Sequence, residues 1–424
     1  MESEIGLSTN ILISSNHSNI FNKKKIIEKL LYLFKKSNGS SGSKYFVLKN
    51  DKESLAIMDS HGSIKSDEFL IFKIDIDTNK ITLVNLFNGF YKNKDLEYFY
   101  KTIDKLNYCL WRSLPKIETK DTINIYNEKV YFYNLKENSI FRLGNVKFLI
   151  REFHIFQNNN NPNSYINNTK QKIFLRVILE TNENDICEIC GKKYSTPDDP
   201  IVKLCLCKKY RHYKCMKDKF KEILIEDENN GCSRFFLKTN CMYCKRYIPW
   251  NFLLYEDNKY KLFELIDIPR KEEEEYLLLE TFDFSINNQG YVKYIYYIKF
   301  RGLQKNKNVE TILIGGDRKK SDKYIYNKLV KVEGDRSISS QHALIDYDIE
   351  EKTLIIRNIS DTHNTLILED NLVINRYDKN KLYLELGNIK IESQLVEKNQ
   401  FNEIEENLKD NVNKIEIREE EEEN

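Results

Sequence analysis

The stretch CEICGKKYSTPDDPIVKLCLCKKYRHYKC, residues 187–215, and the shorter CMYC at 241–244 hold most of the cysteine in this chain of 424 residues. Eight of the nine cysteines lie between 187 and 244, and one histidine, His212, lies among them. Two ligands separated by one or two residues can reach a common metal ion from a single tight turn. Nothing in the sequence indicates the secreted context that a disulfide scaffold needs, so the pattern predicts zinc binding.

The candidate ligands form four short-gap pairs along the chain. Fourteen residues separate the first two pairs, four separate the second and third, and twenty-five separate the last two. In order, the eight candidates are Cys187, Cys190, Cys205, Cys207, His212, Cys215, Cys241 and Cys244. Eight ligands fill two tetrahedral sites and leave no open position for a hydrolytic water, so we expect two structural zinc ions. Cys109 and Cys232 are left over and are expected to be free thiols.

This spacing resembles the RING family, specifically the RING-CH variant with Cys in the fourth ligand position and His in the fifth. The resemblance covers residues 187–244 and implies an interleaved arrangement of two sites. Carried over by ligand order, Cys187, Cys190, His212 and Cys215 would bind one zinc ion, and Cys205, Cys207, Cys241 and Cys244 the other. In RING ligases a surface groove binds the ubiquitin-conjugating enzyme, and the matching positions here are Ile189 and Phe220. Catalysis would then rest on positioning a loaded partner, with no nucleophile in this chain.

A PHD finger has the same ligand order and stays open as an alternative. The four residues between Cys207 and His212 suit a PHD finger, whereas the single residue between Cys205 and Cys207 suits RING-CH. A PHD finger favours an aromatic residue two positions before the seventh ligand, where this chain has Thr239. Many RING domains have Pro directly after the seventh ligand, where this chain has Met242. Ligand spacing alone does not separate the two families.

Short runs rich in Phe, Tyr, Ile and Val flank the cysteine cluster on both sides and predict β-strands. Two of these runs contain the same hairpin signal, Leu-Gly-Asn, at 143–145 and at 386–388. Gly-Asn between alternating strands is typical of a tight turn. Both copies close β-rich stretches of similar length, which indicates two related sandwiches. We therefore predict a mainly β fold with a small zinc-stabilised α+β module.

Composition changes along the chain give the expected divisions. An Asn-rich run with a Pro at 157–170 indicates a linker, and REEEEEN at the end of the chain indicates a solvated acidic tail. The expected parts are a polar segment with one helix (1–43), a β-rich sandwich (44–156), the linker and a connecting strand (157–184), the zinc module (185–250), a helical connector (251–275), a second sandwich (276–395) and the acidic tail (396–424).

Three stretches of the second sandwich resemble an FHA domain, a β-sandwich whose loops bind phosphothreonine peptides. They are ILIGG (312–316), SISSQHALI (337–345) and NISDTHNTLI (358–367). The phosphopeptide-binding residues implied by the resemblance are Gly315, Arg318, Ser339, His342 and Thr365. The family pattern has Arg where this chain has Gly316 and Ser340, and Asn-Gly where it has His363 and Asn364. The resemblance also allows that the first sandwich is FHA-like.

Together these features predict a RING-type ubiquitin-protein ligase or ligase subunit. The zinc module would recruit a ubiquitin-conjugating enzyme, and the FHA-like sandwich a phosphothreonine-containing protein. A non-enzymatic adaptor built from the same modules and a PHD-type histone reader are the alternatives. The formal net charge of +2 argues neither for nor against nucleic acid. The run KKYRHYK mixes basic and aromatic residues, but metal-ligand duty explains much of it, so a nucleic-acid partner is not expected. No run approaches eighteen apolar residues, so a membrane span is not expected either. Without a signal segment, a cytoplasmic or nuclear location is expected.

Overall fold

The computed structural model describes part of the chain, as a set of ranges separated by gaps. These are residues 5–12, 43–51, 54–59, 70–75, 80–85, 110–117, 132–155, 177–179, 185–207, 209–229, 231–237, 241–246, 248–256, 259–271, 273–282, 293–300, 309–316, 326–332, 337–368, 371–375, 382–386 and 389–397. The helix expected in 1–43, the Asn-rich run and nearly all of the acidic tail lie outside these ranges. Within them the protein is mainly β, as the sequence predicts.

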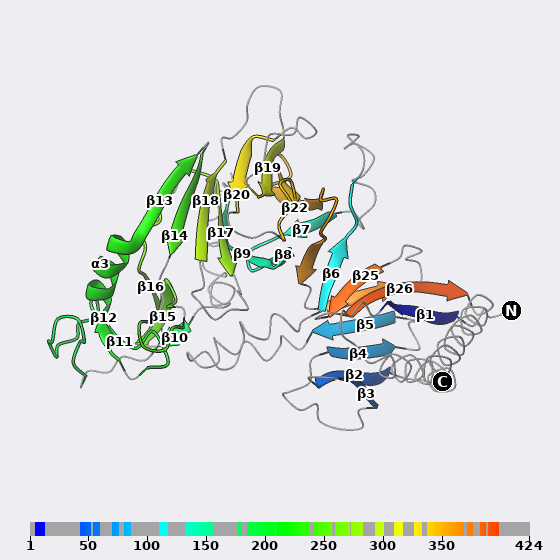
Figure 1. Ribbon diagram of the computed structural model, residues 1–424, viewed down its shortest axis with the longest axis horizontal. Helices are drawn as coiled ribbons and strands as arrows, with labels where there is room; N and C mark the ends of the chain where they lie inside the picture. The colour runs from blue at the N-terminus through cyan, green and yellow to red at the C-terminus, as the bar shows by residue number, and fades with distance from the viewer. Residues whose placement is uncertain are drawn as a thin grey trace, which may run out of the picture. The chain divides into compact units, whose positions relative to one another are not determined.

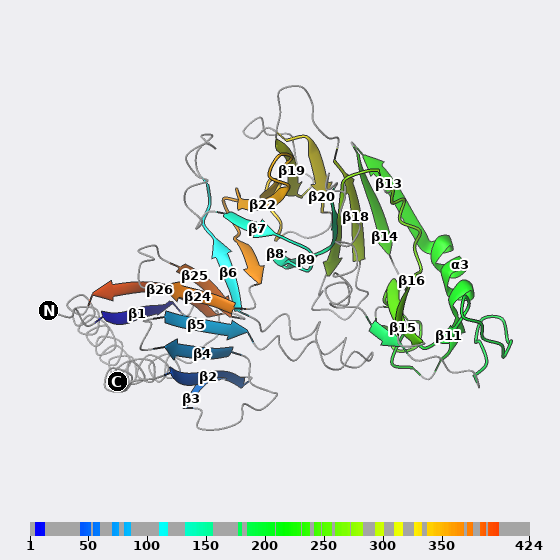
Figure 2. The same ribbon diagram turned by 180° about the vertical axis from the view of Figure 1, so that it is seen from behind.

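The chain divides into two compact units, and both are discontinuous in sequence. The first unit contains 1–89, 105–113 and 368–424, and the second contains 90–104 and 114–367. Strands close together in sequence thus belong to different units, because the divisions fall inside β-rich stretches. Figures 1 and 2 show the strands from opposite sides.

The first unit contains strands from both ends of the chain. One sheet has the order β24-β5-β4-β2-β3, and in the other the neighbours run β1-β26-β25-β6. The bounds are β1 (Ile5–Leu12), β2 (Ser43–Asp51), β3 (Ser54–Asp59), β4 (Leu70–Asp75), β5 (Lys80–Asn85), β6 (Leu110–Leu114), β24 (Asn371–Asn375), β25 (Leu382–Leu386) and β26 (Ile389–Glu397). The strand β1 lies in the segment for which the sequence analysis expected only a helix.

The second unit is a sandwich of two sheets with the zinc-type module attached. One sheet has the order β20-β19-β21-β22-β7, and in the other the neighbours run β23-β8-β9-β17-β18-β14-β13. The bounds are β7 (Phe132–Leu135), β8 (Ile140–Leu143), β9 (Val146–His154), β17 (Tyr276–Phe282), β18 (Lys293–Lys299), β19 (Val309–Gly315), β20 (Lys328–Lys331), β21 (Ala343–Asp348), β22 (Thr353–Asn358) and β23 (Thr365–Leu368).

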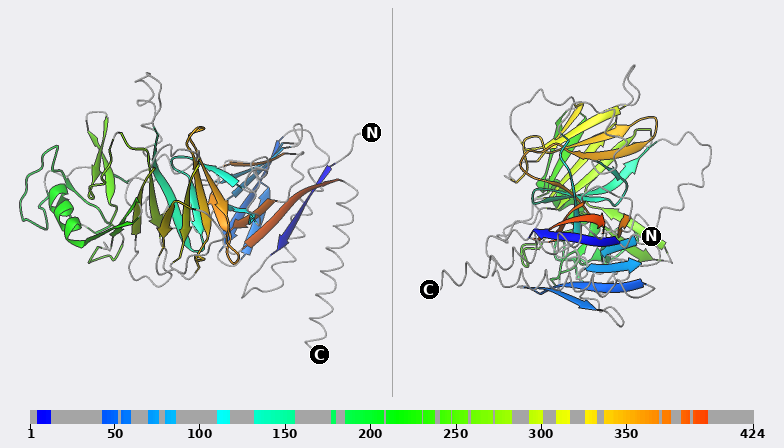
Figure 3. Two further views of the ribbon diagram at one scale, coloured as in Figure 1. Left: turned by 90° about the horizontal axis from the view of Figure 1, so that it is seen from above. Right: turned by 90° about the vertical axis from the view of Figure 1, so that its right-hand side faces the viewer.

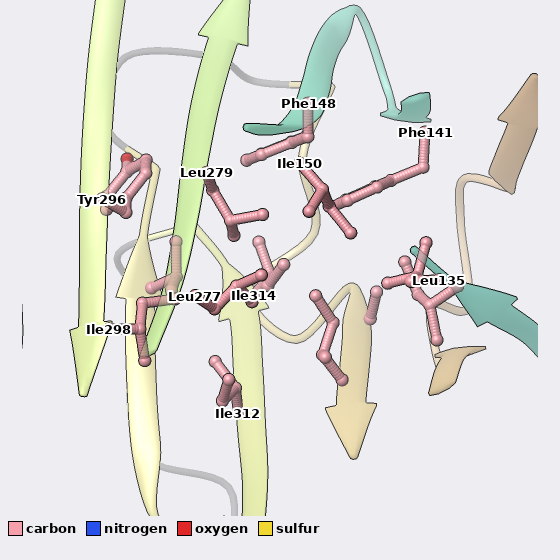
Figure 4. Packing of buried hydrophobic residues seen from close by; sticks show 14 of the residues in the cluster. Leu135, Phe141, Phe148, Ile150, Leu277, Leu279, Tyr296, Ile298, Ile312 and Ile314 are labelled. Carbon is pink, nitrogen blue, oxygen red and sulfur yellow. The ribbon is translucent and has the colours of Figure 1, made fainter. Parts of the chain in front are cut away.

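A single hydrophobic core fills the space between these two sheets. Alternate residues of each strand point into it, because side chains on a strand repeat every two residues. Phe148 and Ile150 enter from β9, and Ile312 and Ile314 enter from β19. Figure 4 shows them together with Leu277 and Leu279 of β17 and with Tyr296 and Ile298 of β18.

Strands β7–β9 therefore belong to the same sandwich as residues 276–368. The sequence predicted one sandwich from 44–156, which includes 132–154, and another from 276–395, which includes 371–395. Instead β9 pairs antiparallel with β17, and β7 pairs antiparallel with β22. Figure 3 shows the cyan strands of this segment between yellow-green and orange strands of the C-terminal half. These strand pairings were not predicted, because alternation of apolar residues along a strand does not determine which other strand pairs with it.

The zinc-type module contains a helix, short strands and two hairpins. Its elements are β10 (Val177–Leu179), β11 (Ile201–Val202), β12 (Arg211–His212), α3 (Tyr213–Ile223), β13 (Leu224–Asn229), β14 (Cys232–Leu237), β15 (Asn251–Glu256) and β16 (Lys259–Glu264). The segment 251–275, expected as a helical connector, contains the β15–β16 hairpin. Two short apolar-rich runs, FLLY (252–255) and YKLF (260–263), with Asp257-Asn258 between them are consistent with a hairpin, which was not predicted.

The module is joined to the sandwich through its other hairpin. Strands β13 and β14 lie in the twenty-five-residue gap between Cys215 and Cys241, and β14 pairs antiparallel with β18 of the sandwich sheet. Cys232 pairs with Ile298 in this register and is buried in the sandwich core. The segment between Cys215 and Cys241, the longest between candidate ligands, thus adds strands β14 and β13 to the sandwich sheet beside β18.

A buried ion pair holds β9 against β17. The guanidinium of Arg151 donates from Nε to the carboxylate of Glu280, and their side chains are 3% and 0% exposed. Breaking a buried pair by removing one partner leaves an uncompensated charge.

We expect Arg151→Met and Glu280→Gln each to lower the free energy of unfolding by about 3–5 kcal/mol, for this reason. The double variant should lose clearly less than the sum of the two, because neither charge is then left alone. Denaturant unfolding of the full-length variants measures all three losses. Strictly additive losses would contradict the pairing of β9 with β17.

Candidate metal centre

The first cluster brings together the first and third ligand pairs. Cys187 and Cys190 lie in the turn at 187–190, His212 lies in β12, and Cys215 lies in the first turn of α3. Their ligand atoms all lie within 4.8 Å of one another. The Nδ1 atom of His212 is 3.2 Å from the sulfur of Cys190 and 4.0 Å from that of Cys215. These separations suit ligands around a single tetrahedral ion.

The second cluster brings together the second and fourth pairs. Cys205 and Cys207 lie just before β12, and Cys241 and Cys244 lie in the turn at 241–244. The sulfur of Cys241 is 3.5 Å from that of Cys205 and 3.8 Å from that of Cys207. Four sulfurs at Zn–S bonds of about 2.3 Å would lie roughly 3.8 Å apart in a tetrahedron. The grouping of all eight residues is the interleaved one that the RING resemblance implies.

The two Cys-x-x-Cys turns have the same backbone hydrogen bonds. The carbonyl of Cys187 accepts from the amide of Gly191, and the carbonyl of Cys241 accepts from the amide of Lys245, each at 2.8 Å. Gly191 has a φ of 70° and Lys245 a φ of 57°, so both turns end in a left-handed residue. This conformation curls the chain so that both thiols of a turn face the same point. Gly adopts it freely, whereas Lys does so at a steric cost.

His212 is oriented by a contact behind its ring. Its Nε2 lies within hydrogen-bonding distance of the carbonyl of Tyr194, and the two rings are 4.8 Å apart. An Nε2–H that donates to this carbonyl leaves Nδ1 unprotonated and facing the thiols. Metal-binding histidines commonly have such a second hydrogen bond, which selects the tautomer.

The thiols within the first cluster differ in the direction of their pKa shifts. Burial raises the pKa of Cys187, but hydrogen bonds from the backbone amides of His212, Cys190 and Ile189 outweigh it and lower the pKa to about 6. Burial and the neighbouring Cys187 raise the pKa of Cys215 to about 12. Thiolates crowded at one point repel each other, so their protons leave as a coupled set.

The second cluster repeats the pattern. Burial raises the pKa of Cys241, but backbone amides and the Cys205 thiol outweigh it and lower the pKa to about 7. Burial raises the pKa of Cys205 well above its usual range. A divalent cation removes this conflict because it compensates several thiolates at once. The donor sets, three thiols with one imidazole and four thiols, fit zinc.

Glu188 connects the two metal-binding turns. It lies between Cys187 and Ile189, and its carboxylate accepts from Nη2 of Arg211 at 2.8 Å and from the hydroxyl of Tyr243 at 2.5 Å. Burial raises the pKa of Glu188, but the hydrogen bonds from Tyr243 and Arg211 outweigh it and the net shift is downward. The turns at 187–190 and 241–244 therefore lie side by side. The sequence analysis did not identify Glu188, since no spacing rule marks it.

The two expected partner-binding residues have opposite surroundings. Ile189 is 43% exposed, on the first metal-binding turn. Phe220 of α3 is 1% exposed, so its assignment to a partner surface is corrected: its side chain packs inside the module. The helix places the residue on its inward face, which helical spacing alone left undecided. Ile186, directly before the first turn, and Met242, on the second turn, are exposed as well, and the sequence patterns did not predict this.

The expected phosphopeptide residues divide into surface and scaffold. The hydroxyl of Ser339 lies 2.6 Å from that of Ser360 and 2.8 Å from that of Thr362, a group of hydroxyls at the ends of two loops. His342 is fully buried and accepts the amide of Ser339 at Nδ1, which supports the loop. Thr365 is also fully buried and donates to Asn358, so neither His342 nor Thr365 offers a surface to a peptide.

Gly315 shapes this loop by its lack of a side chain. A Cβ at Gly315 would lie 2.0 Å from the carbonyl oxygen of Ser340, so no larger residue fits. Arg318, the remaining expected residue, lies outside the described residues. Of the five, the structure thus brings Ser339 to the surface and assigns Gly315, His342 and Thr365 to the support of the loops.

Comparison of the chain with protein-family models, with curated proteins and with solved structures found no match. Within the ranges that the structure describes, no helix has the length and apolar character needed to cross a membrane.

We expect the zinc-loaded full chain to hold about two zinc ions, one in each cluster. Cys187→Ser and Cys241→Ser should each remove about one ion, because each deletes a ligand from a different cluster. Metal analysis after removal of free zinc measures the stoichiometry.

Cys232→Ser is the matched control, since Cys232 is buried in the sandwich core and belongs to neither cluster. Loss of both ions from either single-ligand variant, with the sandwich still folded, would contradict two separate sites.

Proposed function

We propose that this protein acts as a RING-type ubiquitin-protein ligase or ligase subunit. The observation that carries the proposal is the exposed apolar surface on the two adjacent metal-binding turns. Ile189 and Ile186 belong to the first turn region and Met242 belongs to the second, and the Glu188–Tyr243 hydrogen bond joins the turns. Isolated exposed apolar residues are common, but a cluster around a rigid metal module is typical of a docking site.

A ubiquitin-conjugating enzyme is the partner that this surface would recruit. The position of Ile189 matches the RING contact residue, and the exposed Met242 occupies the place where many RING domains have Pro. Because all eight metal ligands are protein side chains, zinc would support the fold and leave the transfer chemistry to the partner. The contribution of this chain would be to hold the loaded partner near a target.

A phosphorylated protein is the proposed target, recruited through the FHA-like loops. Ser339 and Thr362 offer two hydroxyls that can donate to phosphate oxygens, and the buried Ser360 hydroxyl lies behind that of Ser339. The amides of Thr362 and His363 donate to the Ser360 hydroxyl, which holds the exposed loop at 361–364 beside Ser339. Without the family's arginines at 316 and 340, recognition would be weaker than a charge-assisted site provides.

The connection between module and sandwich supports a joint role. Strand β14 of the module continues the sandwich sheet beside β18, and both belong to one compact unit. A target bound at the loops and a partner bound at the metal turns would then be held at a set spacing, as transfer between them requires.

A non-enzymatic adaptor is the second candidate. The burial of Phe220 favours it, since that position supplies no aromatic surface for a conjugating enzyme. An adaptor would use the same apolar turns and hydroxyl-lined loops for protein contacts without ubiquitin transfer.

We expect the zinc-loaded full chain to support autoubiquitination with at least one enzyme from a panel of ubiquitin-conjugating enzymes. Ile189→Ala should lower the rate about tenfold if the side chain is a central contact. Tyr255→Ala is the control, because Tyr255 is similarly exposed but lies on β15. Silence with every conjugating enzyme, from protein with both ions bound, would favour the adaptor.

For the loops, we expect phosphothreonine peptides to bind more tightly than their unphosphorylated forms in a titration of the full chain. Ser339→Ala should weaken binding of the phosphopeptide several-fold because it removes one hydroxyl donor. Ser340→Arg should tighten binding, since it adds a charge-assisted donor beside Ser339. Equal affinity for phosphorylated and unphosphorylated peptides would contradict the phosphate site.

A further inference from the structure

The two compact units share one strand plan. In the first unit, one sheet has the strand order β3-β2-β4-β5-β24, and neighbouring strands of the other sheet follow the order β1-β26-β25-β6. In the second unit, one sheet has the strand order β20-β19-β21-β22-β7, and neighbouring strands of the other sheet follow the order β17-β9-β8-β23. Position for position, β2 corresponds to β19, β4 to β21, β5 to β22 and β1 to β17. The last three strands correspond as well, β24–β26 to β7–β9.

The pairing registers agree as closely as the strand order. Leu70 of β4 pairs with Asn85 of β5, and Ala343 of β21 pairs with Asn358 of β22. The differences 343 − 70 and 358 − 85 both equal 273, so the two hairpins have one register. One pairing differs, because β2 and β3 are antiparallel whereas β19 and β20 are parallel.

The closing strands share a hairpin too. Leu143 pairs with Val146 across Gly144-Asn145, and Leu386 pairs with Ile389 across Gly387-Asn388. In both cases Gly-Asn stands in the sequence between the paired residues. Gly144 has a φ of 56°, a conformation that Gly adopts without strain. The repeated Leu-Gly-Asn therefore marks equivalent hairpins of two copies.

We propose that the chain contains two copies of one sandwich that have exchanged their closing strands within the molecule. Closing segment A, residues 132–154, follows the first copy in sequence but completes the second. Closing segment B, residues 371–397, follows the second copy but completes the first. Each sandwich is then complete only when the other half of the chain has contributed its three strands.

Buried charges explain why segment A belongs with the second copy. Arg151 of segment A neutralises the buried Glu280 of β17. The next residue, Glu152, accepts two hydrogen bonds from Arg270, at 2.8 and 3.0 Å, and one from the hydroxyl of Tyr276. These contacts join segment A to residues that directly precede or form the first strand of the second copy.

Segment B lacks the residues for these contacts. Aligned on Leu-Gly-Asn, Gln394 stands at the position of Arg151 and Leu395 at that of Glu152. In an unexchanged arrangement, Glu280 would lose the guanidinium of Arg151, and Arg270 would lose one of its two carboxylate partners. A buried charge without its partner is strongly destabilising, so the exchanged arrangement is favoured.

The exchange also determines where the metal module sits in the chain of the second copy. The module connects β9 to β17, which are neighbouring antiparallel strands of one sandwich. The module is therefore an insertion within the second copy rather than a linker between two independent domains.

Pairs of introduced cysteines in the zinc-loaded full chain test the exchange. Asn134 of β7 pairs with Ile355 of β22, and Val373 of β24 pairs with Thr82 of β5. Paired residues of antiparallel strands have Cα atoms about 4.5–5.5 Å apart, within the range of a disulfide. We expect Asn134→Cys/Ile355→Cys and Thr82→Cys/Val373→Cys to link on mild oxidation, as shown by linked peptides in mass spectrometry.

The matched controls combine the same four positions in the unexchanged way. Thr82 and Ile355 are equivalent, since 355 − 82 is again 273, so Asn134→Cys/Thr82→Cys and Val373→Cys/Ile355→Cys would link only in sandwiches built from consecutive strands. Links in these two variants, and none in the first two, would overturn the proposal. Links of the first kind found only between chains, on a gel at twice the mass, would also overturn it. Unchanged thermal melting of the reduced variants shows that each one folds as the parent does.

Discussion

The pairing of β9 with β17 is the constraint on which the second unit depends. It brings residues 146–154 against residues 276–282, and the Arg151–Glu280 pair is buried within it. Glu152 extends the same contact to Arg270 and Tyr276. With β9 in place, β7 and β8 complete the two sheets and their side chains fill one core. The intervening module then begins and ends at adjacent strands.

Two different forces stabilise this unit. The sandwich is held by apolar residues that alternate along its strands, whereas the metal module has a small core and two clusters of thiols. Thiols so close together cannot all ionise without a compensating charge, so binding of a divalent cation to these clusters would be coupled to folding of the module. The Glu188 contacts to Arg211 and Tyr243 add a bridge between the two turns. Strand β14 then joins the module to the sandwich sheet.

The surfaces proposed for function lie on the most constrained parts of this unit. Ile189 and Met242 are exposed on turns that carry candidate metal ligands and that end in positive-φ residues. Ser339 lies on a loop that the buried His342 supports through a hydrogen bond to the Ser339 amide. The same loop passes so close to Gly315 that a side chain at position 315 would clash with it. Loops that are positioned by a rigid scaffold are well suited to binding, because little order is lost when a partner docks.

Local patterns in the amino-acid sequence were enough to predict the β character, the Gly-Asn turns and the eight residues of the two clusters. These are local signals: strand alternation, turn chemistry and ligand spacing act over a few residues. The three-dimensional fold was needed to see that β7–β9 complete the sandwich of 276–368, that Phe220 faces inward and that Glu188 joins the two turns. Strand partners, buried faces and ion pairs depend on residues far apart in the chain, such as Arg151 and Glu280. Local patterns leave that choice open, and the cost of burying an unpaired charge decides it.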